Sequence, residues 1–509
     1  PAELSVQVYK LYGDQAMELL YEDPYLLMEL EAPFAAVDRF AIELGVSGDD
    51  PRRVEAGILF EMQYNLTAGH CFLPRQKLQS VTSQLLSVDD ELVSARIDAL
   101  LEHQRLVADE LADISVIYLP QLYEAETYIR DRLVASSNLR FKTNCQAQKM
   151  LQNAQAEIGI QYSRQQAEAI AAALDTGLLL VTGGPGTGKT TILRGVLSVY
   201  QQMGLKTVLA APTGRAAKRL TEVTGQEAST IHRLLEATID VTNGQMYFAR
   251  DAENPLKADA VIVDEMSMVD VQLMHSLLQA VPDKARLILV GDPDQLPPVG
   301  PGQPFSDCLR SGMLPAVRLT EIFRQAQESL IVMNAHRVNA GELPQLKDVK
   351  NDFFFLRAGS EDHVGQTIEG LCSLRLPKNM GIPTDQIQVL TPTRKGGVGT
   401  WALNHRLQNA LNPAAATKKE RQWGEYSFRE GDRVMQIRNN YDILWKKTDG
   451  SSVGTGIFNG DVGVLTSIDP QMEQLTVVFD DKEVVYEFEQ LGELEPAYAM
   501  TVHKSQGSE

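Results

Sequence analysis

The sequence predicts an α/β protein built on doubly wound parallel sheets, with a helical N-terminal region and a small antiparallel barrel inserted into the second α/β domain. From Leu178 onward, short apolar runs alternate with glycine-rich turns and helical stretches, which is typical of buried parallel strands joined by helices. Between Glu425 and Leu494, closely spaced strand segments and turn residues replace this pattern and favour a barrel.

The composition is that of an ordinary globular protein. A chain of 509 residues predicts three or four domains, and 44% hydrophobic with 22% charged residues is a usual soluble balance. Apolar runs of about 18 residues are absent from the sequence, so we expect no membrane-spanning segment. The net charge of -20 argues against nonspecific coating of nucleic acid, because phosphates repel an acidic surface, but it allows a locally basic channel.

Cysteine usage and the chain ends add two expectations. Cys71, Cys145, Cys308 and Cys372 form no CxxC pair, so we expect neither a disulfide scaffold nor a zinc site, and a reducing cytoplasmic location. The first residue is Pro1 rather than Met, no signal stretch follows it, and the last residues stop inside a motif. We therefore expect both ends to be cut or processed.

Residues 1 to about 150 predict a helical domain. The region is rich in Leu, Ala and Glu, and its apolar positions have helical spacing. Segments of this region such as 54–60 and 116–119 carry no catalytic constellation. His70 and His103 have no partner at metal-ligand spacing, so we interpret them as surface or capping residues.

Apolar runs mark the expected strands of the remaining chain. Four of them predict a first parallel sheet, a later run begins a second set, and four more predict the barrel. These strands are 178–182, 207–211, 260–263 and 286–290; then 387–390; then 433–437, 463–465, 475–479 and 483–486.

A phosphate-binding loop follows the first of these strands. Residues 183–190, GGPGTGKT, fit the pattern GxxxxGK[ST] between a strand and a helix. Glycines let backbone N–H groups turn toward phosphates, Lys189 reaches the β- and γ-phosphates, and Thr190 offers a hydroxyl to Mg²⁺. The alternative, a chance glycine-rich turn, does not account for the order of strand, loop and helix.

Two later strands end in polar residues. The strand at 260–263 delivers Asp264, which can hold Mg²⁺, and Glu265, which can orient and deprotonate an attacking water. Gln295, after the next strand, lies where an amide could touch the γ-phosphate. The alternatives are a solvated turn for the acidic pair and a loop that only shapes a turn for Gln295.

A β-hairpin is predicted between the phosphate loop and the acidic pair. Asn243 and Gly244 stand between β-forming residues in 239–248, which is a strong hairpin signal. A bare surface hairpin and a hairpin with a mechanical role both fit this pattern.

Seven motifs resemble those of superfamily 1 helicases and occur in the order of that family. The details are similar to the RecD-type branch, whose members move 5′ to 3′, over roughly residues 160–509. Residues 8–13 and 23–25 also resemble the N-terminal region of RecD-like helicases that act without RecB and RecC partners. The motifs are GGPGTGKT (183–190), APTGRAAKRL (211–220), TIHRLL (230–235), VDEMSM (263–268), GDPDQLPPVG (291–300), LTEIFRQ (319–325) and TVHKSQGSE (501–509).

The resemblance implies a fold and an activity. It implies a helical N-terminal domain at 1–150, a RecA-like P-loop motor domain at 151–330, and a second RecA-like motor domain at 331–509. A β-hairpin pin at about 237–258 interrupts the first motor domain, and an SH3-like barrel at about 426–494 interrupts the second. The implied activity is an ATP-dependent DNA helicase that moves 5′ to 3′ on single-stranded DNA and couples Mg-ATP hydrolysis to unwinding in repair or recombination.

The resemblance also assigns residues to the nucleotide. Gln166 resembles the glutamine that reads adenine, and Arg324 resembles the arginine that reaches the γ-phosphate, where a planar cation stabilises spreading charge. Lys189, Glu265, Gln295 and Arg324 are the implied catalytic residues. Thr190 and Asp264 are the implied metal ligands. The implied nucleotide contacts are Gln166, Gly184, Pro185, Gly186, Thr187, Gly188, Lys189, Thr190, Thr191, Gln506 and Gly507.

Similarly, the family's contacts to the DNA strand can be matched residue by residue. Small hydroxyls and backbone N–H groups grip phosphates without reading sequence. N-capping by threonine and solvated charge are the alternatives for these positions. The candidates are Thr213, Arg215, His232, Thr393, Arg394, Thr501, His503 and Lys504.

The chain departs from the family pattern in two places. Residues 32–38 lack the glycine-rich hairpin of the family's N-terminal helix-hairpin-helix elements. The family's final motif, which supplies a second arginine to the phosphate, is expected beyond residue 509. ATP binding should not need that motif, whereas hydrolysis should.

Three functions are consistent with this sequence: a strand-separating DNA helicase, a translocase or ATPase subunit of a larger recombination or nuclease assembly, and a binding module switched by ATP. Glu265, Gln295 and Arg324 argue against the third, and the N-terminal region favours the first. We expect a monomer that binds single-stranded DNA and duplex junctions, with recombination or repair proteins as partners, and RNA remains open as a substrate.

Overall fold

The computed structural model describes residues 2–30, 32–141, 147–239, 246–323, 327–346 and 352–506. The chain forms two compact units. One comprises Pro1–Asn138, Ser267–Ala280 and Pro297–Leu314, and the other comprises Leu139–Met266, Val281–Leu296 and Pro315–Glu509. The expected domain boundaries at residues 150 and 330 stay predictions. No helix in the described ranges is long and apolar enough to cross a membrane.

The first unit is mainly helical, as the sequence predicts. Asp50 begins its central helix α4, since its side chain accepts a hydrogen bond from the Arg52 N–H and Pro51 occupies the first turn. Val54 and Ile58 of α4 are fully buried in the core of this unit. The helices are α1 (Ala2–Tyr12), η1 (Gly13–Gln15), α2 (Ala16–Glu22), η2 (Pro24–Leu30), α3 (Phe34–Glu43), α4 (Pro51–Leu66), α5 (Arg75–Leu86), α6 (Asp90–Glu102), α7 (Pro120–Asn138), α13 (Val271–Ala280) and α14 (Pro304–Ser311).

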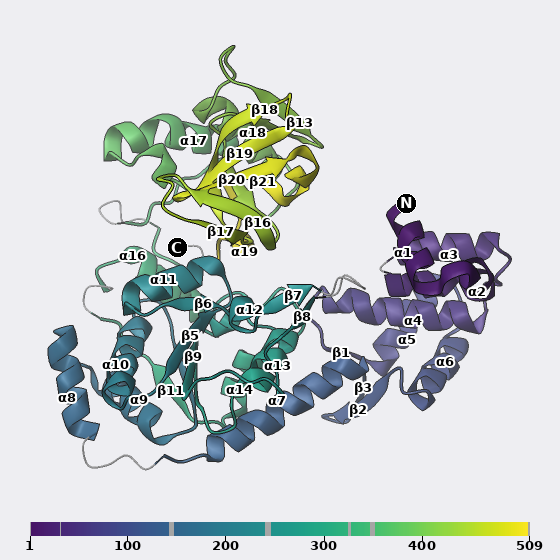
Figure 1. Cartoon of the computed structure of the whole chain (residues 1–509), viewed down its shortest axis with the longest axis horizontal. Helices are drawn as coiled ribbons and strands as arrows, with labels where there is room; N and C mark the ends of the chain where they lie inside the picture. The colour runs from purple at the N-terminus through teal and green to yellow at the C-terminus, as the bar shows by residue number, and fades with distance from the viewer. Residues whose placement is uncertain are drawn as a thin grey trace. The chain divides into compact units, whose positions relative to one another are not determined.

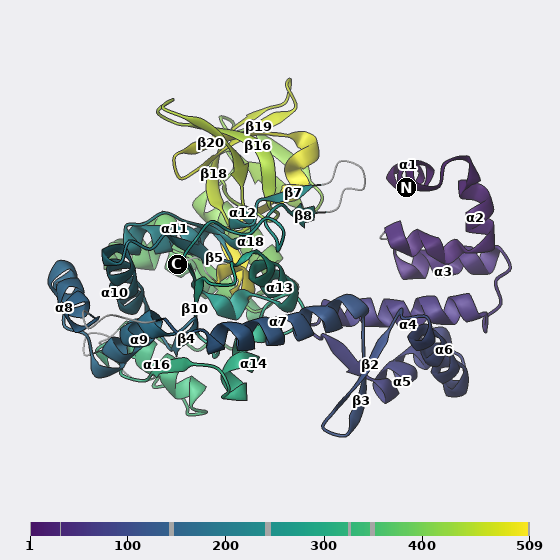
Figure 2. The same cartoon turned by 60° about the horizontal axis from the view of Figure 1, so that its bottom comes forward.

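The first unit also contains a small antiparallel sheet that the sequence did not predict. Its strands are β1 (Phe72–Pro74), β2 (Val107–Leu111) and β3 (Ile114–Tyr118), in the order β1-β3-β2. The sheet lies beside α5 and α6 (Figure 2). The helical interpretation of 116–119 is wrong for residues 116–118, because a short continuous apolar run fits a buried strand and a buried helix equally well.

A six-stranded parallel sheet forms the centre of the second unit (Figure 1). All four expected strands are confirmed, and two edge strands, β6 and β11, join them. The strand order is β11-β4-β10-β9-β5-β6, and each described pair is parallel. The strands are β4 (Leu178–Gly183), β5 (Thr207–Ala211), β6 (Ala228–Thr230), β9 (Ala260–Val263), β10 (Arg286–Gly291) and β11 (Ala316–Leu319).

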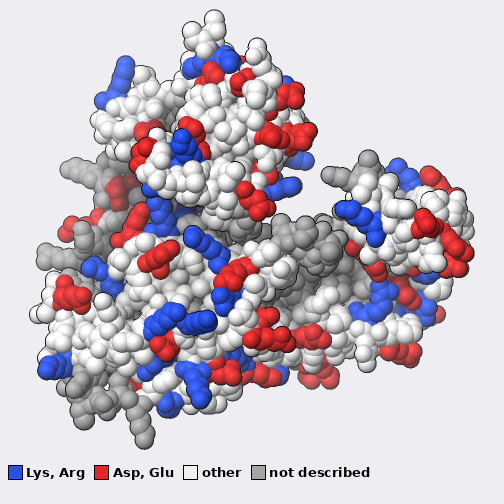
Figure 3. Space-filling view, in the orientation of Figure 1, with Lys and Arg blue, Asp and Glu red and all other residues white. Residues whose placement is uncertain are grey.

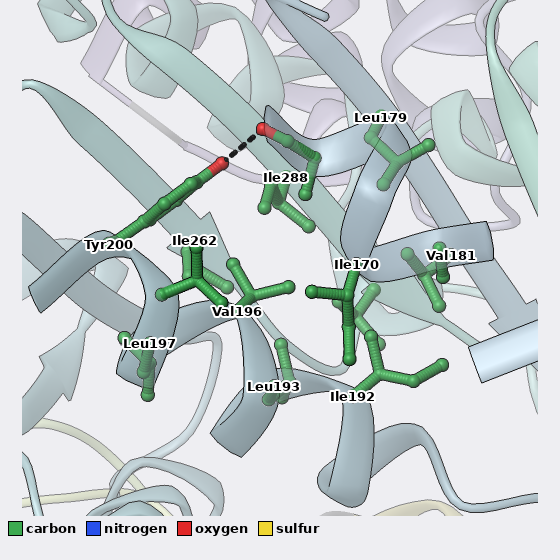
Figure 4. Packing of buried hydrophobic residues seen from close by; sticks show 14 of the residues in the cluster. Ile170, Leu179, Val181, Ile192, Leu193, Val196, Leu197, Tyr200, Ile262 and Ile288 are labelled. Atoms are coloured by element: carbon green, nitrogen blue, oxygen red, sulfur yellow. Dashed lines mark hydrogen bonds between the residues drawn. The ribbon is translucent and has the colours of Figure 1, made fainter. Parts of the chain in front are cut away.

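Helices pack on this sheet through apolar side chains. Ile170, Val181, Val196 and Ile262 lie in one buried cluster (Figure 4), which removes their apolar surface from water. In the same cluster, the Tyr200 hydroxyl donates a 2.7 Å hydrogen bond to the Ala173 carbonyl near the end of its helix. The helices of this part are α8 (Ala147–Ile158), α9 (Arg164–Asp175), α10 (Lys189–Gln202), α11 (Gly214–Thr224), α12 (Ile231–Leu234) and η3 (Met266–Met268).

The arms of the predicted hairpin form an antiparallel ribbon. Strand β7 (Ala237–Ile239) pairs with β8 (Met246–Phe248), and Ala237 lies opposite Phe248. Asn243 and Gly244, at the expected turn, lie outside the described residues. The pairing of the arms is therefore confirmed, and the turn type stays a prediction.

The C-terminal part of the second unit has a parallel strand pair and an inserted antiparallel sheet. Strand β12 (Val389–Thr391) pairs with β22 (Ala499–Thr501), and the strands of the inserted sheet lie between them in sequence. The inserted strands are ordered β17-β16-β20-β19-β18-β15-β21, and a separate ribbon joins β13 to β14. The predicted barrel strands are confirmed. Their bounds are β13 (Glu420–Trp423), β14 (Tyr426–Arg429), β15 (Arg433–Gln436), β16 (Asn440–Lys447), β17 (Val453–Ile457), β18 (Val462–Asp469), β19 (Gln474–Phe479), β20 (Lys482–Glu487) and β21 (Leu494–Pro496).

A buried carboxylate joins this insertion to the adjacent helix. Asp432 is fully buried and accepts hydrogen bonds from Gln408, Asn412 and the Tyr498 hydroxyl. Such a group is tolerated because several donors replace its hydration. The remaining helices are α16 (Leu330–Asn339), α17 (Glu361–Gly370), η4 (Leu371–Met380), η5 (Thr384–Gln386), α18 (Thr400–Leu411), η6 (Phe488–Glu493) and α19 (Val502–Ser505).

We predict that Tyr200→Phe lowers the stability of the second unit by about 1–2 kcal/mol, because the Ala173 carbonyl loses its donor in a buried place. Urea unfolding followed by fluorescence measures the change. Tyr247→Phe, at a tyrosine that is 51% exposed, is the matched control and should leave the midpoint unchanged. Equal midpoints for the two variants would show that the buried hydrogen bond contributes nothing.

Candidate active site

The carboxyl ends of the parallel strands bring the predicted polar residues to one edge of the sheet. The phosphate loop follows β4, Thr213 follows β5, Asp264 follows β9, and Asp292 follows β10. Parallel strands present their carboxyl ends at the same edge, which is where open α/β sheets bind ligands. Residues far apart in sequence therefore meet here.

The glycines of the phosphate loop are required by its shape. Gly186 and Gly188 have positive φ angles of 74° and 83°, a conformation that side chains disfavour. A Cβ on Gly188 would also stand 2.5 Å from Gln166 Nε2 and 2.7 Å from Phe323 Cε2. The loop is thus packed tightly against Gln166 and Phe323 at Gly188. It leads directly into the N-terminus of α10, where N–H groups attract anions.

The lysine of the loop lies folded over its own backbone. Lys189 Nζ donates hydrogen bonds to the carbonyls of Gly183 at 2.5 Å and Gly184 at 3.4 Å. The Thr187 hydroxyl donates to the same Gly184 carbonyl at 2.8 Å. The ammonium group is therefore held beside the position that the loop offers to phosphates.

The acidic pair after β9 occupies an unusual environment. Burial raises the pKa of Asp264, and the charges of Lys189 and Arg219 and a hydrogen bond from the Glu265 N–H oppose this rise. Glu265 has a φ of 56°, which costs a non-glycine residue on the order of 1–3 kcal/mol. Strain and a partly buried carboxylate with a raised pKa at one point indicate a functional site rather than a solvated turn.

A buried carboxylate, that of Asp292, lies at the end of β10, the strand next to β9. Asp292 is 4% exposed, and burial raises its pKa, while the Asp294 N–H donates to it at 3.1 Å. The carboxylates of Asp264 and Asp292 and the hydroxyl of Thr190 are hard oxygen donors. This donor set fits Mg²⁺, which prefers carboxylates, hydroxyls and water.

These residues line one large cleft. Its volume of about 1360 Å³ exceeds that of a usual drug-sized site, so it has room for a nucleotide. It brings together most of the nucleotide contacts that the sequence predicts. Those lining it are Gln166, Gly184, Pro185, Gly186, Thr187, Gly188, Lys189, Thr190, Thr191, Asp264, Glu265 and Gln295.

Two glutamines that the sequence singles out have internal partners. Gln166 is 1% exposed and closes a capping box, in which Ser163 N–H donates to its Oε1 at 3.0 Å. Gln506 Nε2 donates to Gln295 Oε1 at 3.3 Å, so these two predicted residues touch. The roles of these amides toward ATP stay predictions. Arg324 and Gly507 lie outside the described residues.

Several residues of the cleft were not predicted from the sequence. Asp292 could have been found, because it follows a buried strand as Asp264 does. Phe323 and His336 have no such signal: His336 Nε2 lies 3.1 Å from the Pro185 carbonyl although the two are far apart in the chain. Only the folded structure brings α16, the helix that carries His336, to the phosphate loop.

The residues near the six-stranded sheet that are predicted to contact the DNA strand lie at the beginnings of helices. Thr213 caps α11 and Thr230 caps α12, so the capping alternative is met for Thr213. Burial lowers the pKa of Arg215, while Asp461 and Asp480 of the inserted sheet oppose this effect. His232 lies 5.8 Å from the Phe248 ring of the ribbon, measured between ring centroids.

Other residues that the sequence predicts to contact DNA gather at the carboxyl ends of the paired strands β12 and β22. Thr391 of β12 lies opposite Thr501 of β22, so Thr393 and Arg394 leave beside the helix that carries His503 and Lys504. Thr501 caps that helix by accepting a hydrogen bond from the Lys504 N–H at 3.3 Å. On the face drawn in Figure 3, basic and acidic side chains are interspersed, so the net negative charge does not cover it uniformly.

Comparison with known protein families identifies three segments of the chain. Residues 1–72 match the ATP-dependent RecD2 DNA helicase HHH domain, and residues 403–479 match the ATP-dependent RecD-like DNA helicase SH3 domain. Residues 166–301, which carry the phosphate loop, match an AAA domain. The first match includes residues 32–38, although the glycine-rich hairpin is absent there.

Curated relatives extend the similarity over the whole chain. The ATP-dependent RecD2 DNA helicase of Deinococcus radiodurans is 34% identical over 98% of this chain and 66% of its own length. The RecBCD enzyme subunits RecD of Mycolicibacterium smegmatis and Mycobacterium tuberculosis are 30% and 31% identical over 68% of this chain and 64% and 62% of theirs. The chain thus spans somewhat under two thirds of the length of these relatives.

We predict that Asp264→Asn stabilises the ligand-free protein at neutral pH by about 1 kcal/mol, because the variant buries no charge while its amide oxygen keeps the Glu265 N–H bond. The raised pKa means that the folded wild type binds a proton more readily than the unfolded chain. Wild-type stability therefore falls as pH rises through the titration of this carboxyl, and the gain of the variant should shrink toward acid pH.

Thermal unfolding at acid and neutral pH tests this expectation. Glu227→Gln, at an exposed carboxylate, is the matched control and should show no such gain. A variant that is less stable than wild type at neutral pH would mean that Asp264 has a structural role.

Proposed function

Because this chain belongs to the RecD-like branch of the superfamily 1 helicases, we propose that it is an ATP-dependent DNA helicase that moves 5′ to 3′ along single-stranded DNA. The cleft carries this proposal, since it gathers the phosphate loop, the acidic pair Asp264 and Glu265, and Gln295 around one space. Single strands and duplex junctions are the proposed substrates, and repair or recombination is the proposed setting.

In the proposed mechanism, the phosphates of ATP lie on the N–H groups of the loop and Lys189 moves from its own carbonyls to the β- and γ-phosphates. Thr190 and Asp264 would hold Mg²⁺, which would supply positive charge to neutralise the charge that develops on the phosphates. Glu265 orients and deprotonates the attacking water. Arg324 is proposed to reach the γ-phosphate. Gln166 is proposed to read adenine, which would require its side-chain amide to release its capping contact with Ser163.

The coupling to movement is proposed to run through the contact between Gln295 and Gln506. Gln295 follows the first sheet and Gln506 ends the helix that starts at Thr501, next to the strand contacts of the second pair. If contact with the γ-phosphate moved the side-chain amide of Gln295, the amide of Gln506 would move with it. The grip on the strand by Thr213 and His232 would then alternate with the grip by Thr393 and Thr501.

A stand-alone helicase is favoured over a subunit that drives a larger assembly. The relative named RecD2 aligns with 98% of this chain, whereas the subunits named RecD of the RecBCD enzyme align with 68%. Residues 1–72 also match the HHH domain of the ATP-dependent RecD2 DNA helicase, which supports the same choice. We propose a cytoplasmic monomer, with repair or recombination proteins as further partners.

Strand displacement with a DNA duplex that carries either a 5′ or a 3′ single-stranded tail tests the function. We expect ATP-dependent unwinding of the 5′-tailed duplex alone. Lys189→Ala should reduce ATP hydrolysis by at least about a hundredfold, because the phosphates lose their cation. Lys257→Ala, at an exposed lysine, is the matched control.

The assay is run on the 509-residue chain and on the longest form of the protein that contains it. RNA duplexes with the same tails test the open question of substrate. Unwinding from 3′ tails would contradict the direction, and ATP hydrolysis without any unwinding would favour the translocase subunit instead.

The β7–β8 ribbon provides a separate prediction about strand separation. Deleting residues 239–247 and joining the ends with two glycines should leave DNA-stimulated ATP hydrolysis intact, since the cleft contains none of these residues. Unwinding should fall about tenfold or more, the factor that one base-pair step of about 1.4 kcal/mol corresponds to, because the duplex no longer meets an obstacle.

The deletion keeps Phe248, whose ring lies beside His232. Rates of hydrolysis and unwinding are measured on one preparation. Unchanged unwinding would remove the pin assignment, and loss of both activities would mean that the ribbon supports the fold.

A further inference from the structure

One carboxylate holds two of the cations that are proposed to grip the strand. Glu495, on β21, places Oε2 2.8 Å from Lys504 Nζ and Oε1 3.7 Å from Arg394 Nη2. Arg394 follows β12 and Lys504 lies on α19, so the carboxylate bridges two segments that leave the parallel strand pair. Each oxygen of Glu495 faces a different cation, as two oxygens of a phosphate could.

The surroundings of this carboxylate suit a single nucleic-acid strand. Lys395 Nζ lies 5.8 Å from the centre of the Trp401 ring, and Trp401 is 37% exposed at the start of α18. Burial raises the pKa of the Tyr426 hydroxyl, the charge of Glu495 adds to this rise, and the charge of Arg394 opposes it. An exposed aromatic ring beside a cation, such as Trp401 beside Lys395, can stack a base and hold a sugar–phosphate chain.

Partial burial makes the pairing effective. The side chains of Lys504 and Glu495 are 21% and 20% exposed, so water screens their attraction less than at an open surface. Without a negative charge between them, Lys504 and Arg394 would repel each other. A strand phosphate would supply that charge as well, and it would compete with Glu495 for the same donors.

We propose that Glu495 takes the place of a strand phosphate in the DNA-free protein and that DNA displaces it from Arg394 and Lys504. This inference rests on the proposed function. Glu495 is then a positioning residue that keeps the two cations ordered while weakening the grip of the second strand pair. A motor needs such a weak grip, because each step requires release of the strand.

Binding of a fluorescent oligothymidine, measured by anisotropy at several salt concentrations, tests the proposal. Glu495→Gln keeps the shape and removes the charge, and we expect about three- to tenfold tighter binding at low salt. The slope of log affinity against log salt should become steeper by about 0.7, the value for one more phosphate contact on a single strand. Glu483→Gln, on the exposed side of β20 in the same sheet, is the matched control and should bind as wild type does.

A double variant shows whether the effect passes through the bridged cations. In a Lys504→Met background, Glu495→Gln should tighten binding much less than it does alone. Thermal unfolding checks that each variant remains folded. Weaker binding by Glu495→Gln, or binding equal to that of Glu483→Gln, would overturn the proposal.

Failure of the proposed function has a different signature. A wild-type chain that does not bind single strands at any salt, with Arg394→Met and Lys504→Met equal to it, would overturn DNA binding itself.

Discussion

The site depends on the burial of a parallel sheet. Strands β4, β9 and β10 are buried along their whole length, so charged groups can occur only where these strands end. Because the strands are parallel, those ends meet at one edge. Lys189, Asp264 and Asp292 come from different parts of the chain, and the pairing and packing of their strands set the distances between them.

This arrangement lowers the stability of the folded protein at the residues of the candidate active site. Removal from water raises the pKa values of the partly buried Asp264 and the buried Asp292, and Glu265 has a strained backbone. None of these features stabilises the fold, and the apolar cluster beneath them offsets their cost.

The sequence predicts the interior of the fold better than its edges. Continuous apolar runs identified β5 and β9 to the residue, because the strands of a sheet covered on both faces have few polar positions. The short edge strand β6 and the sheet that contains β3 were missed, since pairing and packing in the folded protein, rather than an alternating local pattern, make them strands. The parallel strand pair was half predicted, because only its first member has a marked apolar run.

The same distinction applies to the site. The phosphate loop and Asp264 lie within single short motifs, so their chemistry can be read locally. His336 and Glu495 have no motif, and they reach the phosphate loop and the strand contacts only through tertiary packing. Gln166 is intermediate: Ser163 three residues before it is a capping signature, which the sequence displays and which explains its burial.

The pairing of β12 with β22 constrains the order in which the protein can fold. β12 leaves the ribosome well before β22, and the strands of the inserted sheet are synthesised between them. Until β22 emerges, β12 lacks this neighbour, while the inserted sheet can already close through contacts between successive strands such as β18, β19 and β20. A compact insertion then brings the two ends of a long loop together and reduces the entropy lost when they join. During synthesis, the inserted sheet therefore acts as a folding scaffold for the strand pair that surrounds it in sequence.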